Sequence, residues 1–322
     1  MNTQQFPWQE QLWSRLQLQW AGDRLPHALL VTGSTGVGKQ ALAENLAAQL
    51  LCQAPDNAGA CGQCAACKLL EAGSHPDLRH VTRVEDSRQI RIDSVRALTE
   101  FMGMKSQYGG YRIGLIYPAD TMNANAANSL LKTLEEPPAG AVLILVTDRP
   151  SAIPATVRSR CQQAVVPAPT RDQALTWLRS QAPDLAERAA ALLPMAGGAP
   201  LRALSYAQQD VDQRLSQLAG LLDNLATGRA TLPEATGDWK KDDLALLLDL
   251  LPFLVQQVIR RSTGLPVEGI APSCGDGLDP RALHEYLAYM YNYRALAERP
   301  INAELAIEDL FIRWQRVGRR AA

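Results

Sequence analysis

A glycine-rich loop between an apolar run and a helical run constrains the fold of this chain more than any other feature. The apolar run 28–32 fits a buried strand and leads directly into Gly33-Ser34-Thr35-Gly36-Val37-Gly38-Lys39. Leucines then recur at the spacing of one helical face, at Leu42, Leu46 and Leu50. A strand, a glycine loop with a lysine, and a helix in this order are typical of a phosphate-binding loop.

The rest of the N-terminal half predicts a parallel sheet covered by helices. Helical runs occupy residues 93–102, with Asp93 as the expected N-cap, and residues 125–135. The strand-like runs between them are Leu78–Thr82, Arg112–Tyr117 and Val142–Thr147. Strands that alternate with helices form parallel sheets with helices on both faces. The proline-rich segment 165–170 is expected to leave the sheet.

Beyond that segment the sequence predicts helices only, and 322 residues are too many for one ordinary domain. We expect an α/β domain at residues 1–166, a small helical domain at 167–208 and a helical bundle at 209–322. A glycine- and proline-rich loop interrupts the bundle at 263–280. Apolar residues that fit one helix face near the C-terminus, as core or as a subunit interface, are Leu305, Leu310, Phe311 and Trp314.

Composition and charge exclude several classes of protein. Apolar residues make up 47% of the chain, which is enough for packed cores. The net charge is −1, whereas a protein that coats DNA on its own is normally basic. The sequence has neither an apolar run of about 18 residues, the length of a membrane span, nor the pattern of a signal peptide. We therefore expect a cytoplasmic protein without a membrane segment.

Two departures from a working ATP site follow the glycine loop. Lys39 is followed by Gln40, where a Ser or Thr hydroxyl would bind Mg²⁺. The strand that should end in an acidic metal ligand is followed by Tyr117-Pro118, and Asp120 comes three residues late. Since each missing group can lower the rate by orders of magnitude, we expect no ATP hydrolysis by the chain alone.

The part of the loop that contacts phosphate is nevertheless complete. Glycines let backbone N–H groups approach phosphate oxygens at a helix N-terminus, and the lysine reaches the β- and γ-phosphates. The expected contact residues are Gly33, Gly36, Gly38 and Lys39. The loop therefore predicts that ATP or ADP can bind without hydrolysis. An active ATPase is the alternative interpretation of the same residues.

Four of the six cysteines form the pattern C-x8-C-x2-C-x2-C. They are Cys52, Cys61, Cys64 and Cys67. Two-residue spacers let neighbouring thiolates converge on one ion, and four thiolates make a closed, structural zinc site. Disulfides are the first alternative, and an iron–sulfur cluster is a second, although the ferredoxin continuation C-x3-C-P is absent. A zinc-dependent nucleic-acid binder would also use such a site.

An arginine pair follows the last predicted strand, in Val157-Arg158-Ser159-Arg160-Cys161. An arginine at such a place is ordinarily a surface charge or a salt-bridge partner. In ring-shaped ATPases, however, an arginine from one subunit neutralises the γ-phosphate charge in the site of its neighbour. A chain that has lost its own hydrolysis can still donate such an arginine. Arg160 is the candidate, and Arg158 is the fallback.

Further segments repeat the patterns of one known family. Beside the cysteine cluster they are Arg24–Leu30, Gly73–Asp77, Asn125–Pro138 and Ser159-Arg160-Cys161. The sequence Leu-Leu-Lys-Thr-Leu-Glu-Glu-Pro-Pro inside the third segment is highly specific. Together they resemble the bacterial clamp-loader AAA+ family, and within it the delta-prime subunits of DNA polymerase III holoenzyme. The strong matches cover residues 24–161, and the C-terminal half matches in layout and at 302–314.

This resemblance implies a RecA-like P-loop AAA+ domain with a zinc module, a helical lid domain and a helical collar. It implies a pentamer with gamma/tau ATPase subunits and a delta subunit, which opens the sliding clamp and places it on primed DNA. Within that assembly the chain would be a stator-like subunit, with zinc on the four cysteines and Arg160 acting in trans. An active gamma/tau-like ATPase is the alternative. Arg202 resembles the lid arginine that senses nucleotide, with its register one residue off.

Overall fold

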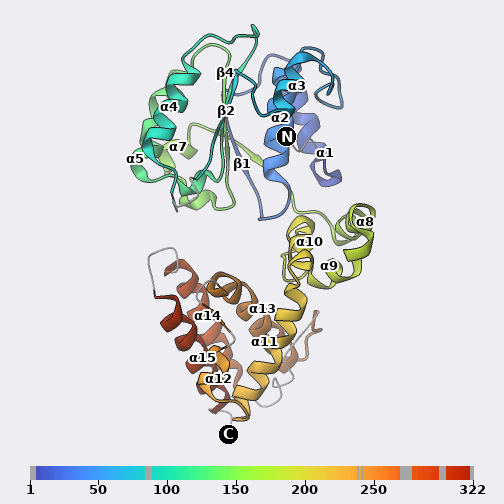
Figure 1. Cartoon of the computed structure of the whole chain (residues 1–322), viewed down its shortest axis with the longest axis vertical. Coiled ribbons are helices and arrows are strands. Elements are labelled where there is room, and N and C mark those ends of the chain that lie inside the picture. Colours follow the sequence, from blue (N-terminus) through green and yellow to red (C-terminus); the bar gives the residue numbers. More distant parts are fainter. Residues whose placement is uncertain are drawn as a thin grey trace. The chain divides into compact units, whose positions relative to one another are not determined.

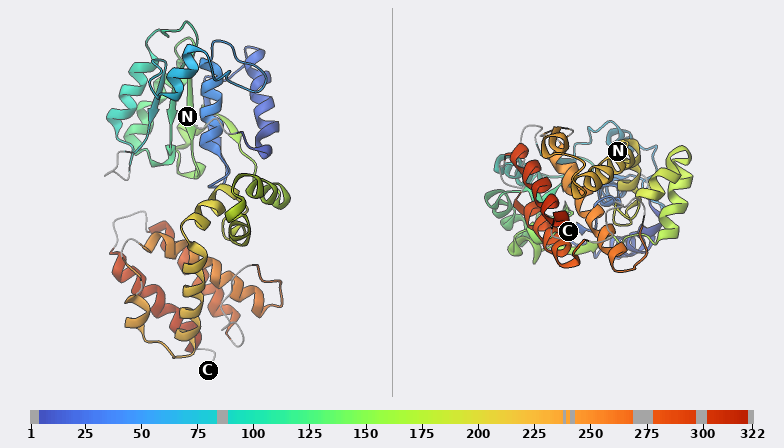
Figure 2. Two further views of the ribbon diagram at one scale, coloured as in Figure 1. Left: turned by 45° about the vertical axis from the view of Figure 1, so that its right-hand side comes forward. Right: turned by 90° about the horizontal axis from the view of Figure 1, so that it is seen from below.

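The computed structural model describes residues 5–83, 89–237, 239–240, 243–268, 278–296 and 302–319. These residues form two compact units (Figures 1 and 2). The first unit comprises Met1–Trp177 and Gly198–Arg202, and it holds the sheet, the glycine loop and the cysteines. The second comprises Leu178–Gly197 and Ala203–Ala322, and its described elements are all helices. The division into three domains stays a prediction.

A five-stranded parallel sheet forms the centre of the first unit, in the order β2-β3-β4-β1-β5. Its strands are β1 (Ala28–Thr32), β2 (Leu78–Val81), β3 (Arg112–Ile116), β4 (Ala141–Val146) and β5 (Gln162–Val165). Every residue of β1, β3 and β4 is buried. Strands buried on both faces explain the continuous apolar runs in the sequence. The predicted α/β class with a parallel sheet is therefore confirmed.

Helices cover both faces of this sheet (Figure 1). On one face lie α1 (Glu10–Ala21), α2 (Lys39–Leu51) and α3 (Ala65–Glu71). On the other lie α4 (Ile92–Met102), α5 (Ala124–Ser129), α6 (Leu131–Glu135) and α7 (Ala155–Arg158). Short 3-10 helices are η1 (Pro7–Gln9), η2 (Ala119–Thr121) and η3 (Pro150–Ala152). All of α2 except Gln40 is buried, so this helix fixes the glycine loop rigidly to the core.

Three local predictions need correction. Helix α4 begins at Ile92 with Arg91 as its N-cap, so Asp93 lies in the first turn and is not the cap. The negative charge of Asp93 still stabilises the helix, because it lies near the positive N-terminal end of the helix dipole. The predicted helix 125–135 is divided at Leu130 into α5 and α6. Residue Val165, expected to have left the sheet, still pairs with Thr32 in β5.

The described part of the chain beyond β5 contains helices and no strand, as predicted. They are α8 (Arg171–Gln181), η4 (Pro183–Leu185), α9 (Ala186–Leu192), α10 (Pro200–Gln208), α11 (Val211–Ala226), α12 (Leu232–Gly237), α13 (Leu244–Ser262), α14 (Pro280–Leu296) and α15 (Ala303–Arg319). The predicted loop 263–280 lies partly outside the described residues. None of the described helices is long and apolar enough to cross a membrane.

The core of the second unit contains most of the apolar face predicted near the C-terminus. Leu310, Phe311 and Trp314 are fully buried, and the Trp314 indole donates a hydrogen bond to the Leu222 carbonyl oxygen at 2.9 Å. Leu305 is 62% exposed, so its assignment to that face is wrong. Leu305 comes one residue before Ala306, and the buried stripe of α15 runs through Ala306 and later residues. The Leu305 side chain therefore lies outside this stripe.

Candidate functional sites

The glycine loop joins β1 to α2 in a conformation that requires glycine. Gly36 and Gly38 both have φ of 84°, in the left-handed region that other residues rarely adopt. A Cβ on Gly38 would lie 2.4 Å from the ring of Phe6, and one on Gly36 would lie 2.6 Å from Cβ of Arg202. Backbone conformation and close packing therefore both exclude a side chain at these two positions.

The N-terminal segment holds the carbonyl groups of the loop. The Trp8 indole donates to the Val37 carbonyl oxygen at 2.9 Å. The Gln9 amide donates to the carbonyl oxygens of Val37 and Gly38, both at 2.9 Å. The Leu201 N–H also donates to the Gly36 carbonyl oxygen at 3.3 Å. The protein itself thus fixes the shape of the loop.

The Lys39 ammonium group is paired inside the protein. Its side chain is only 4% exposed, and Nζ lies 2.5 Å from Oδ1 of Asp148. The same nitrogen donates to the Ser34 carbonyl oxygen at 2.6 Å. The Thr35 hydroxyl donates to the other Asp148 oxygen, Oδ2, at 2.8 Å. Both oxygens of this carboxylate are therefore bound by the glycine loop.

The residues that stand where magnesium would be bound do not form a metal site. The Gln40 amide donates to Oε1 of Glu44 at 2.8 Å. The Asp120 carboxylate accepts hydrogen bonds from the Thr147 hydroxyl at 2.7 Å and from Nε of Arg149 at 2.9 Å. The Arg149 guanidinium also lies 2.8 Å from Oδ2 of Asp120, so the negative charge of Asp120 is already compensated.

A cavity of about 300 Å³ opens beside the loop. Its lining contains one ammonium group, from Lys39, and two carboxylates, from Asp148 and Glu44. Burial raises the pKa of Tyr117, which also lines it, and the nearby carboxylates of Asp148 and Asp120 raise that pKa further. A raised pKa keeps the phenol in its neutral form, so Tyr117 adds no charge to the cavity. Two carboxylates against one ammonium weaken the attraction of this cavity for a polyphosphate.

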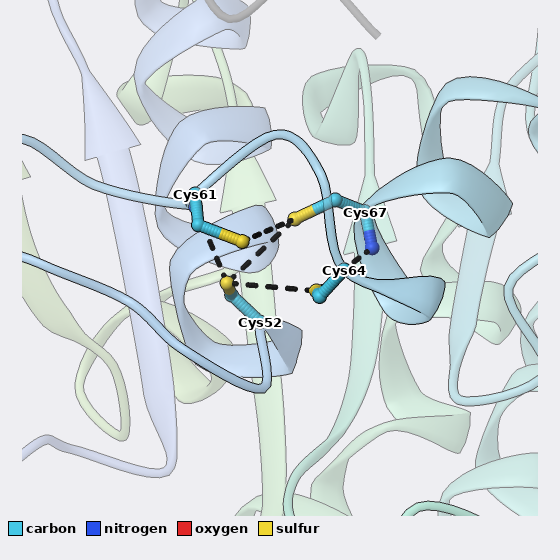
Figure 3. A group of neighbouring side chains, drawn as sticks. All are labelled: Cys52, Cys61, Cys64 and Cys67. Atoms are coloured by element: carbon cyan, nitrogen blue, oxygen red, sulfur yellow. Dashed lines mark hydrogen bonds between the residues drawn. The ribbon is translucent and has the colours of Figure 1, made fainter.

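The four cysteines converge in one cluster (Figure 3). Their sulfur atoms all lie within 4.8 Å of one another. Cys52 is 3.8 Å from Cys64 and 3.6 Å from Cys67, and Cys61 is 4.0 Å from Cys67. Zinc bonded to four sulfurs at about 2.3 Å gives sulfur–sulfur edges of about 3.8 Å, whereas a disulfide needs about 2.05 Å. The cluster therefore fits one tetrahedral metal ion such as zinc and is not disulfide-bonded.

Helix ends and backbone donors position these thiols. Cys52 follows the last residue of α2, and Cys64 is the N-cap of α3, where its sulfur accepts from the Cys67 N–H at 3.4 Å. The sulfur of Cys52 accepts from the N–H groups of Ala54 and Cys61 at 3.4 and 3.3 Å. Burial raises the pKa of Cys64, but the N–H donors around it lower that pKa more, to about 6. Such donors stabilise the thiolate form that binds metal.

The loop between the first two cysteines is also tied to its surroundings. The Asp56 carboxylate accepts from the N–H groups of Ala58 and Gly59 at 2.8 and 3.0 Å. Side-chain amides from outside the loop reach its backbone, with Gln5 donating to Ala58 and Gln17 donating to the Asn57 carbonyl oxygen at 2.6 Å. The cysteine module, residues 52–67, is therefore anchored to α1 through Gln17, as well as to α2 and α3.

Arg160 lies just past α7, and its side chain is 38% exposed. The guanidinium is 2.5 Å from Oε1 of Glu135 and donates to the Thr156 carbonyl oxygen at 3.0 Å. Glu135 is the last residue of α6, in the specific Leu-Leu-Lys-Thr-Leu-Glu-Glu run. Arg158, the last residue of α7, instead donates to the carbonyl oxygen of Pro150 in η3 at 3.0 Å. Arg160 is thus held near the surface by an exposed ion pair that a stronger partner can displace.

The sequence pointed to the glycine loop, the cysteines and Arg160 as candidates, but it did not point to Asp148. The signal was its position two residues after the end of β4, because β4 is the neighbour of β1 in the sheet. The carboxyl ends of neighbouring parallel strands lie at the same edge. A polar residue that ends β4 therefore faces the loop that follows β1.

Comparison with known proteins decides the family. A family model described as DNA polymerase III, delta subunit, matches residues 8–170. The delta-prime subunit of DNA polymerase III from Pseudomonas aeruginosa is 36% identical over 327 aligned residues, which cover 96% of this chain and 97% of that protein. The chain belongs to the delta-prime family of DNA polymerase III. The delta-prime subunit of Escherichia coli K12 is 30% identical, with 96% of this chain and 94% of that protein covered.

Membership of the delta-prime family confirms the predicted resemblance, and it makes the chain a clamp-loader subunit of DNA polymerase III. Among solved structures, a DNA polymerase III gamma subunit-related protein of Thermotoga maritima aligns with a TM-score of 0.46 at 17% identity. That alignment covers 94% of this chain and 98% of the other.

Proposed function

We propose that this delta-prime subunit is a non-catalytic, stator-like member of the clamp loader that completes the ATP site of a neighbouring subunit with Arg160. The observation that carries the proposal is the contrast between the two sites on the first unit. The chain's own Lys39 is 4% exposed and paired with Asp148, whereas Arg160 is 38% exposed at the surface. A guanidinium supplied in trans stabilises the charge that develops on the transferred γ-phosphoryl group.

The proposed partners are the gamma/tau and delta subunits, and the proposed substrate of the whole assembly is a sliding clamp on primed DNA. The near-neutral charge of the chain, −1 at pH 7, supports DNA contact shared with other subunits. On this proposal the chain contributes no ATPase of its own to DNA polymerase III holoenzyme. Its contribution is to position neighbours and to lend one charged group.

We propose further that the cysteine module holds one structural zinc ion. Three sulfur–sulfur distances of 3.6 to 4.0 Å, in a cluster whose sulfurs all lie within 4.8 Å of one another, support a single tetrahedral ion. When bound, the metal would supply a fixed cross-link between the ends of α2 and α3. Four protein thiolates fill the coordination sphere, so no position is left for a substrate.

The chain's own glycine loop is proposed to bind ATP or ADP without hydrolysing either. Gly33, Gly36 and Gly38 keep the open backbone that a phosphate requires, and all three have positive φ. Gln40 brings an amide in place of the metal-binding hydroxyl, and that amide is engaged by Glu44. Any such binding competes with the Lys39–Asp148 ion pair for the ammonium group.

Reconstitution of the assembly tests the role of Arg160. We expect Arg160→Ala to lower the DNA-stimulated ATPase of the pentamer strongly, since an arginine finger contributes about 10³ to 10⁵ in rate at the site that it serves. Arg158→Ala is the matched control, because that side chain is engaged by the Pro150 carbonyl oxygen. Gel filtration must show that both variants assemble. Full ATPase activity in an assembled Arg160→Ala pentamer would exclude the proposed role.

The alternative, an active gamma/tau-like ATPase, rests on the intact glycines and Lys39. ATP turnover by the purified chain separates the two functions. We expect no turnover above background, and we expect Gln40→Thr combined with Tyr117→Asp to move the rate upward by restoring metal ligands. Turnover by the unmodified chain at the rate of an ordinary ring ATPase would favour the alternative.

A further inference from the structure

The ion pair at the glycine loop points to a function for Asp148 that family membership does not supply. We propose that Asp148 sets the ligand preference of the loop, because its carboxylate occupies the place of a phosphate group at Lys39. The native chain then binds ATP, ADP and inorganic polyphosphates weakly. Removing the charge of Asp148 opens the loop to them. This concerns the chain's own loop and is independent of the role of Arg160.

The first argument is the environment of the Lys39 ammonium. A lysine ammonium has three hydrogen-bond donors. Two of them are directed at Oδ1 of Asp148, at 2.5 Å, and at the Ser34 carbonyl oxygen, at 2.6 Å. The side chain is 4% exposed, so it cannot swing into solvent to meet another anion. A phosphate that binds Lys39 therefore competes with the Asp148 carboxylate for this ammonium.

The second argument is that the backbone fixes Asp148 at this position. Val31 of β1 pairs with Val146 of β4, and the Thr147 N–H donates to the Val31 carbonyl oxygen at 3.0 Å. The sheet register therefore places residue 148 beside the start of the glycine loop. The Thr35 hydroxyl then binds its second oxygen at 2.8 Å. The carboxylate is held at two points by the loop that would otherwise bind phosphate oxygens.

The third argument is the charge of the cavity beside the loop. About 300 Å³ of space remains there, so room for a ligand exists. Its charged lining is one ammonium, from Lys39, and two carboxylates, from Asp148 and Glu44. A polyphosphate carries several negative charges, and like charges at close range in a partly buried site repel strongly. Neutralising Asp148 removes one negative charge that repels a polyphosphate. The same change frees the Lys39 ammonium, which attracts a polyphosphate.

Calorimetric titration of the full-length chain tests the proposal. ADP, ATP and inorganic tripolyphosphate are titrated into the native chain and into Asp148→Asn, with EDTA present so that magnesium plays no part. We expect each probe to bind Asp148→Asn at least about tenfold more tightly than the native chain. Asp148→Glu keeps the charge and is the matched control, for which we expect no gain.

A double variant shows whether the gain acts through the lysine. In Asp148→Asn combined with Lys39→Ala, the gain in affinity should disappear, because the freed ammonium is absent. Thermal unfolding of each variant shows whether it is folded, and Asp148→Ser is a second neutral variant should Asp148→Asn not fold. Equal affinity of the native and neutral variants would overturn the proposal. So would a gain that survives the loss of Lys39, or one that Asp148→Glu shares.

The outcome of this experiment does not depend on whether the proposed function is correct. It measures nucleotide binding by the isolated chain, whereas the Arg160 experiment measures ATP turnover by the assembly. If the Lys39–Asp148 pair only stabilises the fold, Asp148→Asn will lower the melting temperature and leave polyphosphate affinity at the native value. That result would reject the assignment of ligand preference to Asp148 and leave the role of Arg160 untouched.

Discussion

Two positively charged residues of the first unit have opposite environments. The Lys39 side chain is 4% exposed and its partner Asp148 is 30% exposed, so the ammonium is buried and the carboxylate is partly exposed. The Arg160 and Glu135 side chains are 38% and 51% exposed. Exposed ion pairs contribute about 0 to 1 kcal/mol, whereas separating a buried pair costs much more. At the scale of single residues, Lys39 is therefore more buried than Arg160, as the proposed function requires.

This difference predicts a small effect for Glu135→Gln. Because its ion pair with Arg160 is exposed, the free energy of unfolding should change by less than about 1 kcal/mol. In the assembly the variant should retain most of the ATPase that Arg160→Ala loses, since the proposed partner of Arg160 there is a phosphate. Chemical denaturation and ATPase assays measure the two effects. A destabilisation above about 2 kcal/mol would show that the pair supports the fold.

At the scale of elements, the sequence predicted what depends on local pattern. Three strands, β1, β3 and β4, were recognised from apolar runs, β2 was recognised from a strand-like run, and the cysteine cluster was recognised from two-residue spacers. The edge strand β5 was missed because its sequence, Gln-Gln-Ala-Val, buries only Ala164. Asp148 was missed because its meeting with Lys39 depends on β4 lying next to β1. Strand order is a property of the whole sheet, and no local pattern encodes it.

The buried carboxylate of Asp77, which precedes β2 and binds the turn before β3, allows a prediction about stability. Asp77 is completely buried and lies 3.0 Å from the Arg112 guanidinium. Its carboxylate also accepts from the Ser106 hydroxyl and from the N–H groups of Gln107 and Tyr108. We expect Asp77→Ala to destabilise the chain by about 3 kcal/mol, because a buried guanidinium loses its partner. Urea denaturation measures this, and a loss below about 1 kcal/mol would contradict it.

The same carboxylate predicts a pH dependence. Burial raises the pKa of Asp77, but the hydrogen bonds and the Arg112 charge lower it more, so it lies below its usual value. A depressed pKa in the folded state contributes stability that is present above the unfolded pKa of about 3.9. That stability is lost as the pH falls through the folded value. Denaturation between pH 6 and 2 should show this loss in the native chain and a smaller one in Asp77→Asn.

The cysteine module predicts a defined response to metal removal. Elemental analysis should find about one zinc per chain, as four thiolates bind one tetrahedral ion. Cys61→Ser should lower this stoichiometry, whereas Cys161→Ser, outside the cluster, should not. Removal of zinc by a chelator should lower the melting temperature and speed amide exchange in residues 53–63, because the ends of α2 and α3 lose their cross-link. Carefully prepared protein with four reactive thiols and no metal would refute the assignment.

At the scale of the whole molecule, delta-prime function is a property of the assembly. The chain has a net charge of −1, and its own glycine loop is closed by an ion pair. The isolated chain should consequently bind primed DNA weakly, with little dependence on salt. Fluorescence anisotropy at two salt concentrations measures this. Tight, steeply salt-dependent binding would instead support a zinc-dependent nucleic-acid binder.

The central claim is that this chain serves a neighbour's ATP site and not its own. One measurement tests both halves: the DNA-stimulated ATPase of two reconstituted pentamers, one carrying Lys39→Ala and the other Arg160→Ala. We predict that Lys39→Ala leaves the rate near that of the unmodified pentamer and that Arg160→Ala lowers it severely. A severe loss with Lys39→Ala and a normal rate with Arg160→Ala would contradict the account.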